Sequence, residues 1–223
     1  MIGLPSEPNE ASSEASVRGD ILAVATRLFA DRGFDGTSLQ AIADRVGVRK
    51  PSVLYHFRSK EILREKVLQR LLAHWRDALP RLLKAGTSGE DRFLGIVGEV
   101  VRFFSADPSR ARLLLREALD RPAFMREVFT DFFAPLMGLV ADSIKRGQRE
   151  GLVLANVDAE AYVLHIFQLV VGSIGTVSVT DGVLGGDARE ALDRCTREVV
   201  RMARSSLFRP EANERGGKHG QLL

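Results

Sequence analysis

The chain of 223 residues contains a single cysteine, Cys195, so it cannot have an internal disulfide framework. A lone thiol is typical of proteins in a reducing compartment, and we expect a cytoplasmic location and a packing role for Cys195. Its 4 histidines lack the spacing of metal ligands. No glycine-rich phosphate-binding motif is present. We therefore expect no enzyme activity, no metal site and no bound cofactor.

Long hydrophobic runs are also scarce. One uncharged, largely apolar segment, residues 161–179, approaches the ~20 residues that a membrane span needs. Five polar side chains interrupt this segment, and acidic residues flank both of its ends. A membrane helix is the alternative, but a helix buried on several sides explains the pattern better, and we expect no membrane partner. Residues 1–15 lack the features of a signal peptide, and we expect them to be a disordered arm and residues 210–223 a disordered tail.

No segment of useful length alternates between polar and apolar residues, so the sequence gives no indication of β-strands. Hydrophobic residues make up 45% of the chain and charged residues 27%, which is ordinary for a globular protein. The apolar residues recur at helical spacing, and we expect an all-α fold of about nine helices. A bend is expected at Pro80 and another at Pro135. The expected helices span residues 16–32, 38–45, 49–56, 59–84, 90–105, 108–118, 121–149, 158–180 and 187–208.

The segment 37–61 has the pattern of two short helices joined by a tight turn. Its first helix has Leu39, Ile42, Ala43 and Val46 on one face. Gly47 supplies the left-handed conformation that ends a helix. A helix-turn-helix of this kind places its second helix in the major groove of DNA. The alternative is an ordinary helical hairpin with a basic exposed face.

Residues 16–66 resemble the DNA-binding domain of the TetR family of bacterial transcriptional regulators. An amphipathic helix leads into Asp-Arg-Gly-Phe-Asp-Gly-Thr at 31–37, and Tyr-His-Phe-Arg-Ser-Lys-Glu at 55–61 opens the next helix. The corresponding run in the family usually reads Leu-Tyr-aromatic-His-Phe-x-Ser-Lys-Glu. Leu54 stands where the family often has a tyrosine that contacts phosphate. The resemblance implies a helix-turn-helix domain at 16–62 and a helical ligand-binding and dimerisation domain at 63–209.

The charge distribution agrees with a DNA partner. The net charge is only +3, but eleven Lys and Arg residues lie between positions 45 and 84 against three Asp and Glu residues. A basic block of this kind attracts phosphates, although a solvated helix face explains part of it.

Two groups of DNA contacts are expected. Arg49, Lys50 and Ser52 lie in the first turn of the second helix, where side chains reach base edges. The residues expected to hold phosphates are Thr37, Tyr55, His56, Arg58 and Lys60. Tyr55 could instead pack against the first helix, and His56 could be a core histidine.

One such reading helix recognises few base pairs, so we expect a homodimer on a near-palindromic operator. The resemblance implies that the last two helices pair with those of a second copy as a four-helix bundle. Packing within one protomer is the alternative for each candidate interface residue. The candidates are Val163, Ile166, Val170, Ile174, Leu192, Val199 and Met202.

The middle helices are rich in large apolar side chains, which favours a cavity for a small apolar effector. The alternative is that these side chains form the ordinary core. The candidate lining residues are His74, Trp75, Phe103, Phe104, Phe129, Phe133, Met137 and Phe167.

Together these features predict a homodimeric repressor that a small apolar ligand releases from its operator. The alternative is a DNA-binding regulator of the same fold that acts as an activator or answers to a protein partner.

Overall fold

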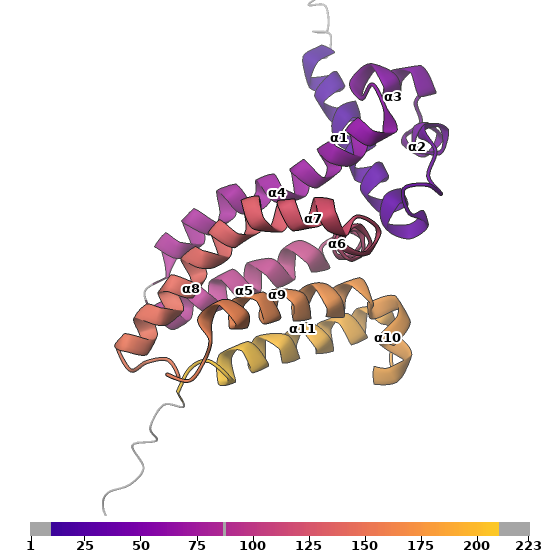
Figure 1. Ribbon diagram of the computed structural model, residues 1–223. Helices are drawn as coiled ribbons and strands as arrows, with labels where there is room; N and C mark the ends of the chain where they lie inside the picture. Colours follow the sequence, from indigo (N-terminus) through magenta and orange to yellow (C-terminus); the bar gives the residue numbers. More distant parts are fainter. Residues whose placement is uncertain (1–9, 87, 210–223) are drawn as a thin grey trace, which may run out of the picture.

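The computed structural model describes residues 10–86 and 88–209, with side chains from residue 15 onward (Figure 1). The disordered arm expected at 1–15 and the tail expected at 210–223 fall largely outside these ranges. Eleven α-helices and one π-helical turn make up the described part, which contains no strand. The expected all-α fold is confirmed.

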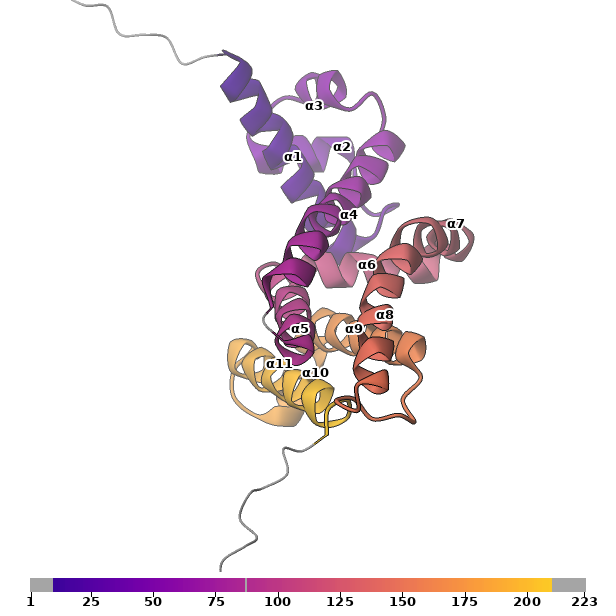
Figure 2. The same ribbon diagram turned by 90° about the vertical axis from the view of Figure 1, so that its left-hand side faces the viewer.

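The helices form a head and a body. The head consists of α1, α2, α3 and the first turns of α4, and α4 runs from the head along the body (Figures 1 and 2). The bounds are α1 Glu10–Arg32, α2 Leu39–Val46, α3 Lys50–His56, α4 Lys60–Ala85, α5 Gly89–Ser105, α6 Ser109–Asp120, α7 Pro122–Val128, the π-turn η1 Phe129–Phe133, α8 Ala134–Arg149, α9 Ala159–Gly175, α10 Val177–Leu184 and α11 Ala188–Ser205.

The helix-turn-helix in the head forms for local reasons. The Ser38 side chain accepts a hydrogen bond from the Ala41 amide at 3.0 Å and caps α2. Gly47 ends α2 in the left-handed conformation, with φ of 82°, and its amide donates to the Ala43 carbonyl. Ile42, Ala43 and Val53 are fully buried between the helices. The small Ala43 side chain lets α3 approach closely.

Helix α1 begins at Glu10, six residues before the expected start at 16. The added turns contain alanine and glutamate, which are good helix formers. Toward its end, α1 packs against α6 of the body, and one hydrophobic core runs from Ile21 and Phe29 in the head to Leu113 and Ile174 in the body. Head and body therefore share a packed interface.

The expected helix 121–149 consists of α7, η1 and α8. The Ala134 amide donates to the Phe129 carbonyl, five residues earlier, which widens the helix by one residue. Pro135 then lies in the first turn of α8, where its missing N–H costs little. At Pro135 the structure therefore has a π-turn directly before the proline. At Pro80, α4 continues as a helix.

The expected helix 158–180 was wrong as a single element. It breaks at Thr176 into α9 and α10, whose axes differ by 82°. Gly172 and Gly175 weaken the helix here, and the Thr176 hydroxyl donates to the Gly172 carbonyl. Within the described residues no single helix is long and apolar enough to cross a membrane, although this bent pair meets the length and composition criteria jointly.

The last helix also ends earlier than expected, at Ser205 instead of 208. Leu207 and Phe208 leave the helix and turn back, so that Phe208 forms an antiparallel bridge with Val153. Leu207 is fully buried. The chain end thereby covers the far end of the body core.

Thr37 and Lys60 stabilise the head itself, which corrects their assignment as phosphate contacts. Thr37 is 1% exposed, and its hydroxyl donates to the Gly33 carbonyl at 2.8 Å. The Lys60 ammonium donates to the carbonyls of Phe34 at 2.9 Å and Thr37 at 3.0 Å and lies over the Phe34 ring. Its charge holds the loop between α1 and α2 against α4.

We expect Lys60→Met to lower the free energy of unfolding by about 1–3 kcal/mol, because two carbonyls lose a charged donor. Urea denaturation followed by circular dichroism would measure the change. The control is Lys66→Met on the same helix, since Lys66 binds only the exposed Gln69 side chain. Equal effects of the two substitutions would contradict the structural role of Lys60.

Candidate nucleic-acid interface and ligand cavities

Helix α3 is anchored on one side and free on the other. Val53 and Phe57, which directly follows the helix, are buried at 0% and 1% exposure. Arg49 and Lys50 are exposed, and Ser52 is half-buried at the start of the helix. The three residues expected to read bases therefore lie together at the start of α3, as α3 runs along the outer side of the head (Figure 1).

Tyr55 and His56 occupy the end of the same helix. Tyr55 is 72% exposed, so the alternative that it packs against the first helix is wrong. The His56 ring lies edge-on to Tyr55, with ring centroids 5.2 Å apart, and is half-buried. Arg58 follows in the exposed connection to α4. These three side chains lie at the end of α3 and directly after it, and their contact with phosphates stays a prediction.

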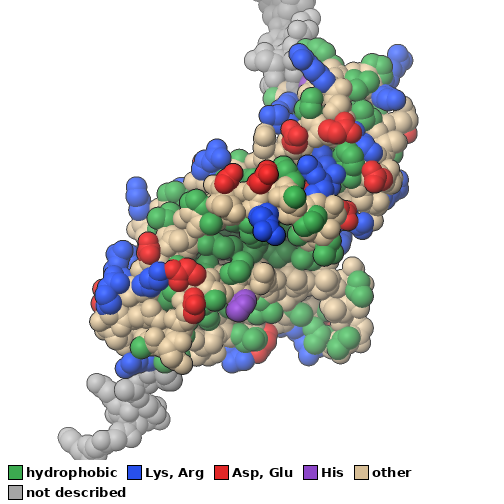
Figure 3. Space-filling view, in the orientation of Figure 1, with side chains coloured by type: hydrophobic (Ala, Val, Ile, Leu, Met, Phe, Trp, Pro, Cys, Tyr) green, Lys and Arg blue, Asp and Glu red, His purple; other side chains and the backbone are tan. Residues whose placement is uncertain are grey.

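A space-filling view shows Lys and Arg side chains around the head, with Asp and Glu side chains among them (Figure 3). One of these acids is Glu61, in the first turn of α4. Hydrogen bonds from its own backbone amide and from Ser59 lower the pKa of Glu61, so it is charged at neutral pH. Phosphate contacts are therefore expected from Arg58 and α3 and not from the start of α4.

A buried ion pair joins the head to the body, and the sequence did not indicate it. Arg64 on α4 is 8% exposed, and its Nε lies 2.6 Å from Oε1 of Glu117 on α6. The Arg64 guanidinium also lies 4.4 Å from the ring centroid of Phe34. The partners are far apart in sequence, so only the folded chain brings them together.

Several of the expected cavity residues do line one cavity, which we call the inner cavity. It lies between α4, α5, α8 and α9, has a volume of about 80 Å³ and is almost wholly apolar. The expected residues Trp75, Phe133, Met137 and Phe167 line it. The other side chains around it are Leu79, Phe93, Ile96, Val97, Val100, Leu136, Val140, Val163 and Ile166.

The other expected cavity residues lie elsewhere. His74 and Phe103 border a separate cleft of about 380 Å³ next to α1, which both charged and apolar side chains line. Phe104 is buried in the core, and Phe129 stacks on Phe133 at 4.8 Å without lining the inner cavity. The prediction that these four residues line the same apolar pocket was therefore wrong. Helical spacing showed that the side chains point inward but not which neighbours they meet.

The pKa of His74 in this cleft is lowered. Burial is the main cause and the nearby Arg110 the next, because both disfavour the charged ring. Nε2 of His74 lies 2.9 Å from Oε1 of Glu99, within hydrogen-bond distance. The His74 ring also stacks on Phe103, with centroids 4.3 Å apart.

Most of the residues expected at the dimer interface pack inside one protomer. Val170, Ile174 and Val199 are at most 4% exposed and belong to the core, so they cannot meet a second copy. Val163 and Ile166 line the inner cavity. Leu192 is half-buried against the core. Only Met202, at 42% exposure, lies on the outer surface.

The apolar side chains that do face outward on these elements lie on neighbouring positions that the sequence pattern did not single out. Leu169 on α9 and Val179 and Val183 on α10 are exposed, the last two by more than 80%. Leu169 precedes the bend at Thr176, whereas Val179 and Val183 follow it on α10, which packs against α11.

Comparison with known proteins identifies both halves of the chain. Residues 21–67 match the family model "Bacterial regulatory proteins, tetR family", and residues 91–203 match "Tetracyclin repressor-like, C-terminal domain". The chain is similar to the HTH-type transcriptional repressor KstR2 of Mycolicibacterium smegmatis, with 35% identity over 40% of this chain and 43% of the relative. It is also similar to the HTH-type transcriptional activator FasR of the same organism, with 34% identity over 44% of each chain. The chain thus matches less than half the length of these two relatives.

The fold has solved counterparts. The structure of the ketosteroid transcriptional regulator KstR2 of Mycobacterium tuberculosis aligns with a TM-score of 0.68 at 18% identity, covering 86% of this chain and 95% of that one. Identity at this level shows the fold alone. The relatives are transcriptional regulators and not enzymes. With one model matching the helix-turn-helix and the other more than half of the chain, this protein belongs to the TetR family of DNA-binding transcriptional regulators.

Proposed function

We propose that this protein is a homodimeric repressor that binds a near-palindromic operator in the cytoplasm and leaves it when a small apolar ligand binds. The observation that carries the proposal is α3, whose apolar side is fixed by Val53 and Phe57 while its basic side is free. The inner cavity supports the ligand part, because it is apolar and is lined by Trp75 of α4, the helix that enters the head.

For DNA recognition we propose that Arg49, Lys50 and Ser52 contact base edges. Tyr55, His56 and Arg58 would hold the backbone and set the register of α3 in the groove. Leu54, 37% exposed, lies between these groups and cannot donate a hydrogen bond to a phosphate.

For the dimer we propose a second copy packed against α9, α10 and α11 through Leu169, Val179, Val183 and Met202. Exposed apolar side chains on neighbouring elements are typical of protein interfaces. The α9–α11 pair packs together at the end of the body away from α4 (Figure 1), so a partner there leaves α3 free.

A second function has one observation in its favour. The inner cavity, at about 80 Å³, is smaller than the ~300–1,000 Å³ of most ligand sites. The alternative is a regulator of the same fold that a protein partner controls, or an activator, as the relative FasR is.

DNA reading can be tested with Lys50→Ala and Arg58→Ala. We expect Lys50→Ala to cost about 1–3 kcal/mol on the operator but much less on random DNA, because a base contact is lost. Arg58→Ala should weaken binding to all DNA alike and lessen its salt dependence. Fluorescence anisotropy on an operator selected from random duplexes, at several salt concentrations, measures both. Equal losses on operator and random DNA for Lys50→Ala would reject its assigned role.

The dimer can be tested with the double variant Leu169→Glu and Met202→Glu. Two carboxylates in the proposed interface would be desolvated, so we expect sedimentation velocity to show single copies and operator binding to fall at least about tenfold. Leu119→Glu on α6 is the control, because Leu119 is 82% exposed and lies outside this surface. A double variant that sediments as two copies would show that the interface lies elsewhere.

Ligand release can be tested by filling the inner cavity. We expect toluene to lower operator affinity of the unaltered protein and to have no effect on Val163→Phe, whose larger side chain occupies the cavity. The control is Leu119→Phe on α6, because Leu119 is 82% exposed and lies outside both the cavity and the proposed dimer surface. If toluene acted equally on the Val163→Phe variant, the effector site could not be the inner cavity.

A further inference from the structure

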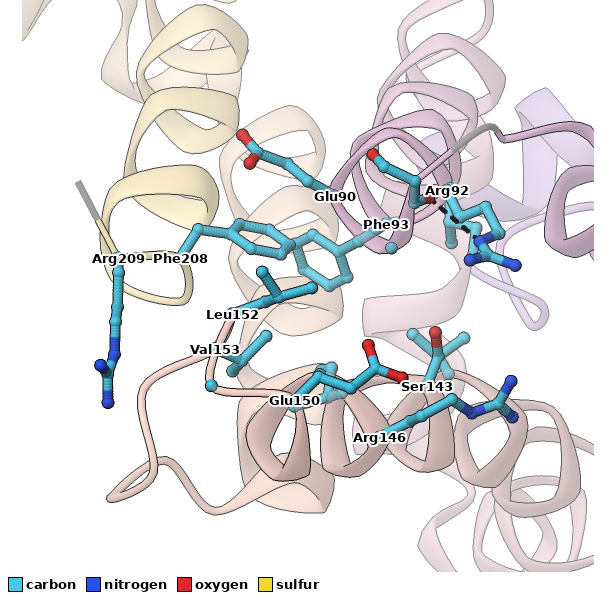
Figure 4. Close-up of a pocket in the computed structure, with 17 residues that line it drawn as sticks. Glu90, Arg92, Phe93, Ser143, Arg146, Glu150, Leu152, Val153, Phe208 and Arg209 are labelled. Atoms are coloured by element: carbon cyan, nitrogen blue, oxygen red, sulfur yellow. Dashed lines mark hydrogen bonds between the residues drawn. The ribbon is translucent and has the colours of Figure 1, made fainter. Parts of the chain in front are cut away.

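A second, larger cavity lies at the end of the body opposite the head. This outer cavity has a volume of about 520 Å³, which falls in the range of small-molecule sites. It is formed by the first turns of α5, the second half of α8 and the chain end at Phe208 and Arg209 (Figure 4).

The lining of the outer cavity has an apolar part. The Phe93 and Phe208 rings meet edge to face with centroids 5.8 Å apart, and Ile144 and Val153 are buried beside them. In the close-up the two rings lie in the middle of the cavity wall, next to Leu152 (Figure 4). A ligand in this cavity would therefore have an apolar portion.

The other part of the lining is charged, with an excess of arginine. Arg92, Arg146 and Arg209 line the cavity together with Glu90 and Glu150. Glu90 is already paired, since the Nε of Arg204 lies 2.6 Å from its Oε1. Among the described residues Arg146 has no ion-pair partner. Glu150 is the one acid of the lining without an ion-pair partner among the described residues. The lining therefore has three arginines against one unpaired acid.

Two of these arginines lie on the same side of the outer cavity. Arg92 of α5 and Arg146 of α8 both extend toward that side, whereas Arg209 extends away from them (Figure 4). Arg92 uses its Nε to donate to the Ser88 carbonyl at 3.0 Å, which orients the side chain, and its terminal nitrogens make no hydrogen bond to the described residues. Such a pair of planar donors suits a carboxylate. A doubly charged phosphate would suit the site less well, because Glu150 would repel it more strongly.

The outer and inner cavities adjoin each other. Phe93, Ile96 and Val140 line both of them, so a single layer of side chains separates the two. Beyond this layer the inner cavity has almost no polar surface. A slender apolar chain could pass Phe93 if its ring changed rotamer.

We propose that the two cavities form one site for an amphipathic carboxylate. Its carboxylate binds Arg92 and Arg146, and its apolar chain passes Phe93 and enters the inner cavity. This inference rests on the proposed function, because it names the class of ligand that fills the inner cavity. It also accounts for the small inner volume, since most of the ligand lies outside it.

Decanoate and its neutral analogue 1-decanol test the proposal on the full chain. Trp75 is the only tryptophan and lines the inner cavity, so its fluorescence reports whether the chain of the ligand arrives there. Titration calorimetry measures affinity independently. We expect decanoate to bind more tightly than 1-decanol and to change Trp75 fluorescence.

Arg146→Ala should weaken decanoate binding about tenfold or more and leave 1-decanol unaffected, because a charged hydrogen bond is lost. The control is Arg149→Ala, which removes the same charge from the last turn of α8 but does not line the cavity. Arg146→Ala is expected to fold normally, since Arg146 is exposed and its side chain makes no hydrogen bond within the described part of the chain.

Equal affinities for decanoate and 1-decanol, equal effects of the two arginine substitutions, or a silent Trp75 would each overturn the proposal. Operator binding, measured separately, keeps it distinct from the proposed function. If 1-decanol releases the operator and no arginine matters, the carboxylate site fails and ligand release remains. If decanoate binds through Arg146 but the operator stays bound, ligand release fails and the carboxylate site remains.

Discussion

The arrangement of this molecule depends on the buried ion pair between Arg64 and Glu117. Both side chains are at least 90% buried, so each charge has lost most of its hydration, and leaving either one alone would cost about 3–5 kcal/mol. The second carboxylate oxygen of Glu117 has no hydrogen bond in the described structure and lies 3.7 Å from Arg121 at the start of α7. The pair therefore favours one alignment of α4 on α6 and disfavours intermediate ones. Head and body are held in register by a contact that does not tolerate gradual sliding.

Other contacts at the same junction fix the end of α1 against α6. Arg112 pairs with Asp31 at 3.0 Å, and Arg116 donates to the Ala30 carbonyl at 3.3 Å. These two contacts are more exposed and so contribute less than the buried pair. Because α1 supports α3 through Phe57 and the head core, the position of α6 determines where α3 points.

The parts of this structure that sequence could predict are those set by near neighbours in the chain. The cap at Ser38, the left-handed Gly47 and the exposed start of α3 all depend on residues within a few positions. Lys60 shows the limit, because its partners are carbonyls of a loop 23 and 26 residues earlier. Its positive charge was evident, but its structural use was not. The structure also differs from the prediction at Thr37. Its hydroxyl donates to the Gly33 and Leu28 carbonyls and is buried.

In the body, hydrophobic spacing identified inward-facing residues without identifying their partners. Val170 and Ile174 were predicted to face another subunit, yet α9 packs on α6 and buries them in the protomer's own core. Gly175 allows this approach, because a Cβ there would lie only 2.7 Å from Leu115. The inner cavity arises from the same packing, since Val163 and Ile166 on the preceding turns of α9 meet α8 and α5 but do not fill the space between them. No single helix contains the information for such a cavity.

Helix α4 connects these features physically. Trp75 lines the inner cavity, and Arg64 and Lys60 lie on the same helix near the head. Between Lys60 and Trp75 the helix rises about 22 Å at 1.5 Å per residue, and a hydrogen-bonded helix of this length transmits displacement with little loss. A ligand that moves Trp75 must therefore either tilt α4 or strain the buried pair with Glu117. Because the Arg64–Glu117 pair favours one alignment of α4 on α6, a large enough displacement of α4 would move the head as a unit and would not distort α3. In the proposed dimer, two such heads would then change their spacing together, which is what the proposed release from a near-palindromic operator requires.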